Sequence, residues 1–217
     1  MLSFGRADAM LHRLILITVM LCFGFAAVDV SAAEAIGTVS RIQGDASGIN
    51  SGTTRALGLN ASVFLGEVVT TAPAARLEIT FHDDTRLTLG GTAKLTLDRY
   101  IFDSGTGRGT LKFAVAGAFR FVSGRLSKLA RSDVNVTTPV ATIGIRGTEF
   151  WGGPIDDQAL GVFLVEGAVR VSNAAGARIL SRAGQGTNVA TAGRAPGPVT
   201  FWPREKVNRA IATVAFQ

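Results

Sequence analysis

The sequence predicts an all-β protein, and three observations support that prediction. Glycine is abundant, with 26 among 217 residues, whereas only 18% of the residues are charged. Short runs of Val, Ile, Thr, Leu and Phe alternate with clusters of Gly, Asp, Asn and Ser, which is typical of short strands joined by tight turns. Several runs alternate apolar and polar residues with the period of a half-buried strand. We expect many short antiparallel strands in a two-layer or solenoid-like stack, followed by a short C-terminal helix.

The clearest alternation lies in Arg76–Phe81, where the apolar side chains share one face and the polar ones the other. The apolar face resumes at Leu87 and Leu89 after a polar turn. We expect Leu164–Val169 to form another hairpin, because Gly167 supplies the positive φ that a tight turn needs. The predicted strands are Ile36–Ile42, Glu67–Thr71, Arg76–Phe81, Arg86–Leu89, Lys94–Leu97, Thr110–Val115, Ala118–Val122, Val134–Thr137, Ala141–Ile145, Thr148–Trp151, Leu160–Val165, Ala168–Val171 and Arg178–Leu180.

Two stretches rich in glycine and polar residues predict loops, at Gly44–Asn60 and Ala183–Val199. After the second of them, Pro203–Val214 predicts one short helix. Its proline suits a first helical position, and its apolar residues recur at the spacing of one helical face. We expect this helix either to pack on the β domain or to project from it.

The N-terminus predicts export. Arg6 and Arg13 precede an apolar segment, Leu14–Val28, which is shorter than the roughly 20 residues of a membrane-spanning helix. The small residues Ser31–Ala33 follow, as at a signal-peptide cleavage site. Residues 1–33 therefore predict a secretory signal peptide, with an uncleaved signal anchor as the alternative.

Export defines the organisation that we expect. We assign 34–190 to one β domain and 191–217 to a Gly/Pro linker with the short helix, located in the periplasm or secreted. Translation can begin at Met1 or at Met10, which gives a tidier signal sequence. The only cysteine, Cys22, leaves with the signal, which excludes a thiol nucleophile, a Cys-ligated metal and a disulfide in the mature chain.

A series of motifs follows this strand pattern in a fixed order. Its strongest element is Thr138-Pro139 followed by Ile145-Arg146-Gly147-Thr148-Glu149-Phe150. The others are Ile36–Ala46, Leu65–Thr71, Leu77–Leu89, Phe119–Gly124, Val165–Val169 and Ala183–Gln185. In order and spacing these motifs resemble the FecR domain family, over about Ile36–Val189. The residues that match the family signature are Pro139, Gly144, Arg146, Gly147, Thr148 and Phe150.

The resemblance implies a β-rich, partly solenoid-like domain that transmits or receives signals outside the cytoplasm. The best-known members regulate a sigma factor and carry a cytoplasmic anti-sigma region and a membrane helix before the FecR domain. Only about 13 residues precede the apolar segment of the signal here, so the resemblance implies a stand-alone FecR domain and the sigma-regulator function is not carried over. Asp84 stands where the family has Gly in a hairpin turn, and Asp tolerates the left-handed region better than most residues.

Two interpretations of the signature remain open. Pro139 belongs at a strand start or edge, and Gly144 inside a strand indicates a bulge or a close backbone approach. Gly147 interrupts the strand again. In one interpretation the motif fixes a bend in the sheet; in the other, Arg146 and Thr148 line a contact with a partner.

The mature sequence contains no recognisable catalytic or metal-binding set. His82 is its only histidine and lies in a predicted turn, and no serine has the context of a nucleophile. The acid pairs Asp83/Asp84 and Asp156/Asp157 suit a hydrolase, but adjacent acids in turns are usually only polar turns. We expect no enzymatic activity and no cofactor or metal.

A basic stretch suggests how the protein binds. Residues 108–131 contain six Lys or Arg and no acid, and the formal net charge of the chain is +6. Arg120, Arg125, Lys128 and Arg131 are candidates for contact with a partner or an anion. Export disfavours nucleic acid and leaves an envelope protein, an anionic polysaccharide or lipid head groups. The alternative is a solvated strand face with scattered charges.

The function predicted from the sequence is that of an exported, non-enzymatic FecR-like binding or signalling module that acts through protein contacts in the cell envelope. The alternatives are an envelope structural or anionic-glycan-binding protein and, as a third class, a hydrolase that uses paired acids.

Overall fold

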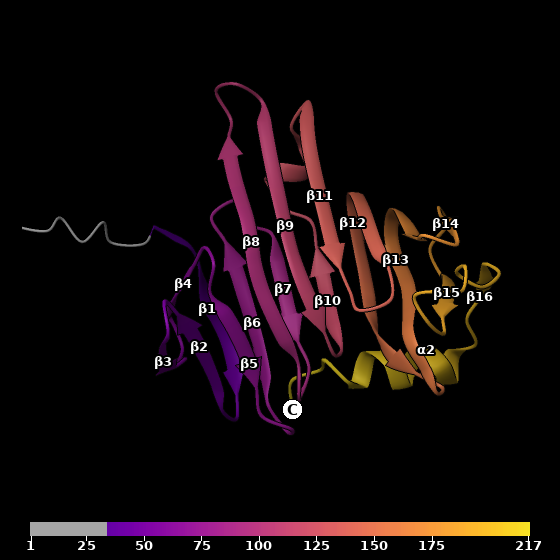
Figure 1. Cartoon of the computed structure of the whole chain (residues 1–217), viewed down its shortest axis with the longest axis horizontal. Helices are drawn as coiled ribbons and strands as arrows, with labels where there is room; N and C mark the ends of the chain where they lie inside the picture. Colours follow the sequence, from indigo (N-terminus) through magenta and orange to yellow (C-terminus); the bar gives the residue numbers. More distant parts are fainter. Residues whose placement is uncertain (1–33) are drawn as a thin grey trace, which may run out of the picture. The chain divides into compact units, whose positions relative to one another are not determined.

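The chain folds into a curled β-sheet with one short C-terminal helix (Figure 1). The structure is a computed structural model that describes residues 34–217, so the predicted signal peptide at 1–33 and Cys22 lie outside the described residues. The prediction of an all-β fold with a short C-terminal helix is confirmed: 58% of the described residues are in strands and 7% are helical.

One continuous sheet of 16 strands forms two layers. The first layer consists of β3 (Thr53–Ala56), β2 (Ala46–Asn50), β5 (Val68–Thr71), β8 (Lys94–Asp103), β9 (Arg108–Ala116) and β11 (Arg131–Thr137), in that order. The second layer consists of β10 (Phe119–Val122), β7 (Arg86–Leu89), β6 (Arg76–Phe81), β1 (Ala35–Gln43) and β4 (Ser62–Phe64). The long strand β12 (Thr142–Ile155) joins the layers, because its first part pairs with β11 and its second part with β10.

The hydrophobic core lies between the layers. Phe113 of the first layer stacks on Phe121 of the second with ring centroids 6.0 Å apart, and Tyr100 stacks on Phe81 at 5.8 Å. Most strands place buried apolar side chains on the inward face, as Leu77 does in β6. The period-two alternation seen in the sequence therefore reflects one face turned to the core and one to solvent.

The remaining elements extend from β12. β13 (Gln158–Asn173) runs antiparallel along it and also pairs with β14 (Gly176–Leu180) and β15 (Gln185–Val189), and β16 (Thr200–Phe201) pairs with β15. A 3-10 helix, η1 (Arg125–Lys128), leads from β10 into β11. Because the chain crosses to the second layer and returns through η1, β11 runs parallel to β9, the one parallel pair among residues 34–217.

Three expectations about local structure were wrong. Leu164–Val169 is not a hairpin but the middle of β13, although Gly167 does have a positive φ of 84°. The predicted loop Gly44–Asn60 contains β2 and β3, in which the small residues Ala46 and Gly48 face inward. The predicted loop Ala183–Val199 contains β15. In runs of small residues the alternation between the inward and outward faces of a strand is weak, because Gly, Ser and Ala differ little in hydrophobicity.

The predicted helix is α2 (Arg204–Ala212), and it packs on the domain. Ala210 and Val214 are buried in a second apolar cluster with Trp151, Phe163 and Trp202. In the described part of the chain, no helix combines the length and the apolar character of a membrane span.

Candidate functional site

The FecR-like signature forms a corner between the two layers. The register of β12 against β13 shifts between Arg146 and Glu149 and again before Phe150. At this point β12 leaves β11 and begins to pair with β10. Gly147 in β12 has a φ of 56°, and Gly167 faces it from β13 with a φ of 84°. The motif therefore contains a bulge in each strand that turns both strands from one layer to the other.

Thr148 fastens this corner. Its side-chain hydroxyl donates to the carbonyl of Ala168 at 2.8 Å and accepts from the Ala168 amide at 3.3 Å. Its own amide donates to the hydroxyl of Ser123 at 2.8 Å, and its carbonyl accepts from the Ser123 amide at 3.0 Å. Thr148 is buried, so these bonds satisfy polar groups that would otherwise be unpaired away from water.

The other signature residues divide between core and surface. Phe150 is fully buried, with ring centroids 5.7 Å from Phe119 and 5.7 Å from Phe121. Pro139 is exposed in the turn between β11 and β12, where no ladder bond needs its nitrogen. Gly144 lies on the outer side of β12, and Arg146 is exposed. The first interpretation of the motif, a bend in the sheet, agrees with this geometry.

A shallow hollow of about 250 Å³ lies on the outside of the corner. It is lined by Val122, Ser123, Ser127, Lys128, Gly147, Thr148, Glu149 and Glu166. Lys128 and Glu166 are exposed, and neither forms an ion pair with any residue in 34–217. A Cβ at Gly147 would meet nothing within 4 Å, so the space over the bulge is open. The hollow therefore presents both signs of charge on a rigid backbone.

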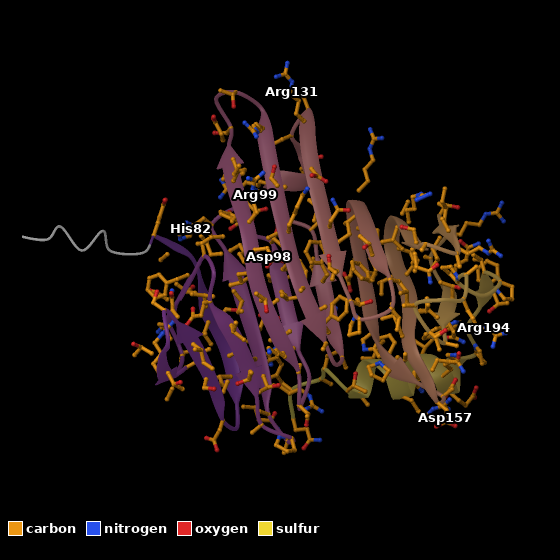
Figure 2. All side chains as sticks on the ribbon, in the orientation of Figure 1. His82, Asp98, Arg99, Arg131, Asp157 and Arg194 are labelled. Carbon is orange, nitrogen blue, oxygen red and sulfur yellow. The ribbon has the colours of Figure 1, made fainter. Side chains whose placement is uncertain are left out.

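The basic stretch does not form a single surface. Arg120 lies on the outer side of the second layer and binds Glu149 through Nε and Nη2 at 3.0 and 2.6 Å. Arg125 of η1 pairs with Asp84 at 2.8 Å. Lys128 lines the corner hollow, and Arg131 lies at the start of β11, far along the first layer (Figure 2). Arg120 therefore faces a different side of the molecule from Arg131.

A buried carboxylate holds η1 beside the corner. Asp83, which is fully buried, accepts hydrogen bonds from the Leu126 amide at 3.0 Å and from the hydroxyls of Thr85 and Tyr100 at 2.6 and 3.1 Å. Burial, together with the charge of Asp83, raises the pKa of Tyr100 above its ordinary value. The position of Lys128 is thus set by the β6–β7 turn, a long-range contact that local sequence does not reveal.

The residues weighed as catalytic serve the turns. His82 is exposed in the β6–β7 turn, and Asp84 there has the positive φ, 66°, expected of a residue that replaces glycine. Asp156 and Asp157 form the two-residue turn between β12 and β13, and both have positive φ. Within residues 34–217, no three His, Cys, Asp or Glu side chains are grouped as metal ligands.

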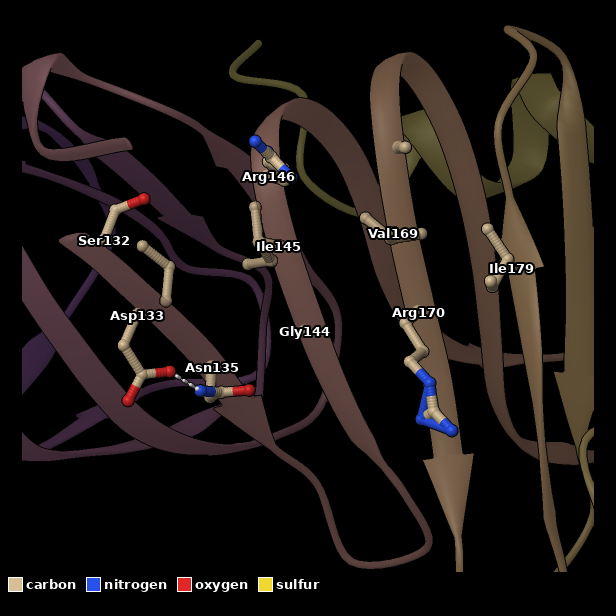
Figure 3. Close-up of a pocket in the computed structure, with 11 residues that line it drawn as sticks. Ser132, Asp133, Asn135, Gly144, Ile145, Arg146, Val169, Arg170 and Ile179 are labelled. Atoms are coloured by element: carbon tan, nitrogen blue, oxygen red, sulfur yellow. Dashed lines mark hydrogen bonds between the residues drawn. The ribbon is translucent and has the colours of Figure 1, made fainter. Parts of the chain in front are cut away.

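An open depression lies on the outer face of the sheet (Figure 3). It occupies about 320 Å³ across β11 to β14. Gly144 lies at the bottom of the depression and has no side chain to fill it. The side chains around it include Arg146, Arg170, Asp133 and Asn135. Arg170 was not among the residues predicted from the sequence, although its place between the apolar Val169 and Val171 indicated that it faces outward.

Comparisons with known proteins agree with this geometry. Residues 67–170, which include the corner, match the family model described as FecR protein. No curated protein matches the sequence.

Two crystal structures of a candidate anti-sigma factor from Parabacteroides distasonis ATCC 8503, at 1.65 and 2.50 Å resolution, have a similar fold. Each has a TM-score of 0.52, with 15% and 14% sequence identity respectively, and the similarity covers 66% of this chain. The chain spans 64% and 63% of the length of those two chains. The likeness concerns the fold, whereas the family match concerns the sequence itself: this protein carries a FecR domain over residues 67–170.

Proposed function

We propose that this protein is an exported, non-enzymatic FecR-type module that takes part in signalling by binding another protein of the cell envelope. The FecR match and the fold shared with a candidate anti-sigma factor support a role related to signalling. The N-terminal pattern of a signal peptide supports export to the periplasm or beyond. The corner hollow supports the contact with another protein.

One observation carries the proposal: Lys128 and Glu166, which have no ion pair within residues 34–217, present opposite charges beside the open Gly147 bulge. Complementary charges on a partner would fix its register and orientation there, which is the main contribution of charge to protein recognition. The surface is preformed, because hydrogen bonds of Thr148 and Asp83 hold both sides of the hollow. A preformed surface binds with little loss of conformational entropy.

The contacts of the polar side chains support the non-enzymatic part of the proposal. Three of the four acids weighed for hydrolysis already serve other contacts: Asp83 holds η1, Asp84 pairs with Arg125, and Asp156 binds α2. His82 is exposed, whereas Asp83 is buried and has hydroxyl and amide partners instead of His82. We therefore propose binding rather than chemistry.

The test is a crosslinking pull-down of the full chain from its own cell envelope. Two charge reversals, Lys128→Glu and Glu166→Arg, are compared with Arg204→Glu, an equal change on the exposed start of α2. We expect one protein to be captured by the unaltered chain and by Arg204→Glu, and to be reduced about tenfold by either hollow variant, as for the loss of one charge-assisted contact. The purified partner must then bind with the same order of affinities. Absence of a partner, or equal capture by all variants, would overturn the proposal.

A further inference from the structure

A second surface of the protein is strongly basic. On β9, Arg108 and Lys112 face outward, and the register of β9 with β8 and β11 places Arg99 and Arg131 on the same side. The depression around Gly144 brings Arg146 and Arg170 to that side as well. We call this surface the basic face. It comprises Lys94, Arg99, Arg108, Lys112, Arg131, Arg146 and Arg170, and Figure 2 shows two of these side chains, Arg99 and Arg131.

Few acids neutralise the basic face. Lys112 pairs with Asp133 at 2.8 Å, and Asp103 lies opposite Arg108 while it accepts hydrogen bonds from Thr106. Asp98, beside Arg99 in a bulge of β8, is also exposed. Lys112 is the one cation of the basic face that has an ion pair within residues 34–217. The positive charge of the other cations of the basic face is therefore available to a ligand.

The cations are arranged in a row across the strands. The strand registers place Arg99, Lys112, Asn135, Gly144 and Arg170 opposite one another on five successive strands. The next row contains only small side chains, four of them hydroxyl-bearing: Thr96, Ala114, Thr137, Thr142 and Ser172. Strands lie about 4.8 Å apart, so each row is roughly 20 Å long. Together they form a low strip of hydroxyls bordered by guanidinium and ammonium groups.

The composition of the strip favours a polysaccharide over a protein segment. Protein interfaces depend on buried aromatic or aliphatic anchors, and the strip offers Thr, Ser, Ala, Asn and Gly in their place. Exposed apolar residues lie only beyond the ends of the rows: Ile179 follows Arg170 in the cationic row, and Ile49 lies two strands beyond Thr96 in the other. Guanidinium groups bind carboxylates and phosphates in bidentate geometry, while hydroxyls match the hydroxyls of sugars.

We propose that the basic face binds an extended anionic polysaccharide, which lies across β8, β9, β11, β12 and β13. Its acidic groups contact Arg99 and Arg170, which have no ion pair within residues 34–217, and its hydroxyls contact the row of small side chains. None of the residues that line the corner hollow belongs to the basic face, although Arg146 of the basic face directly precedes Gly147 of the hollow. The proposal therefore gives the protein one site for an envelope protein and a second, adjoining site for an envelope glycan. This inference does not depend on the proposed protein partner.

The test uses polygalacturonate, a polymer of uronic acid, as the probe for the full chain. Arg99→Gln with Arg170→Gln removes two cations of the row, and Arg182→Gln with Arg204→Gln removes the same charge elsewhere on the surface. Gly144→Gln fills the strip without changing charge; a Cβ there has room, since its nearest neighbour is the Asn135 side chain at 3.5 Å. Urea unfolding verifies that each variant is folded.

We expect the unaltered chain to bind polygalacturonate and to lose most of that affinity between about 0.1 and 1 M salt. The row variant and Gly144→Gln should each weaken binding at least about tenfold, because each removes or blocks charge-assisted contacts, whereas the control variant stays close to the unaltered chain. No binding, or equal weakening in the control, would overturn the proposal. Tighter binding of polyglutamate would assign the face to an acidic protein, and tighter binding of anionic phospholipid vesicles would assign it to a membrane. All row variants should still capture the protein partner of the corner hollow.

Discussion

Replacement of Gly167 by alanine tests the corner between the two layers. Gly167 has a φ of 84°, and a Cβ there would lie 2.1 Å from the carbonyl oxygen of Gly147 and 2.9 Å from Thr148. The left-handed conformation costs a residue with a side chain about 1–2 kcal/mol. The two bulges must also move apart to make room for the Cβ. This weakens the two hydrogen bonds between Thr148 and Ala168, each of which contributes about 1 kcal/mol to stability.

The expected loss of unfolding free energy is therefore about 3–4 kcal/mol, or roughly 10 °C in Tm for a domain of this size. Urea unfolding followed by fluorescence of the two tryptophans measures it. Gly147→Ala is the matched control: its φ of 56° is also positive, but its Cβ would meet nothing within 4 Å. Conformational strain alone should cost it about 1 kcal/mol. An equal loss in both variants would refute the close approach of the two bulges.

Three further predictions concern polar groups. Thr148→Val keeps the shape but removes the hydroxyl that serves both strands at the corner, so it should cost about 1–3 kcal/mol in urea unfolding, and a neutral result would refute that role. Hydrogen bonds from Lys206, and from a second cation on α2, lower the pKa of Asp156. Its stabilisation is therefore present above the ordinary Asp range, about 3.9, and is lost as pH falls below it, so Asp156→Asn should destabilise the protein at neutral pH and not at low pH. Burial and Asp83 raise the pKa of Tyr100, the only tyrosine, so tyrosinate absorbance of the folded protein should appear only above pH 10. The unfolded chain loses this proton near pH 10, so the stability of the fold should decrease as the pH rises above 10. A titration midpoint near 10 in the folded protein would contradict the buried contact.

Much of the fold was predictable from the sequence, because the strands that bound the core have strong contrast between their faces. Arg76–Phe81 and Arg86–Leu89 were located to the residue. The failures fell where contrast is low, as in the run of small residues Ala46–Asn50, or where a strand contains glycine. Gly147 and Gly167 divided β12 and β13 into short predicted pieces, because a positive φ indicates a turn more often than a bulge inside a long strand.

The candidate site was only partly predictable. The signature residues were identified, and the bend they form was one of two interpretations. The basic stretch was identified along the chain, but the structure pairs two of its cations with distant acids. Arg120 pairs with Glu149 of β12, and Arg125 of η1 pairs with Asp84 in the β6–β7 turn. Such pairs depend on sheet register, which the sequence of one segment does not contain.

The basic face was not predicted from the sequence, because it forms only when distant segments pair in the sheet. Its cations are scattered between residues 94 and 170, and neither composition nor charge runs bring them together. Arg99 and Arg170 are 71 positions apart in the chain, yet the pairing of five strands places them in one row. The alternation within each strand predicts that these cations face outward. Their alignment in one row could be seen only from the pairing of the strands in the sheet.

The central claim is that the outside of the FecR signature corner contacts a protein. Photo-crosslinking in living cells tests it most directly, with a photoreactive residue placed at Lys128 in the full chain and, as the control, at Thr54, which is exposed on the edge strand β3. The account predicts one defined protein adduct from position 128 and none of that adduct from position 54. The same adducts from both positions, or no protein adduct from position 128, would contradict it.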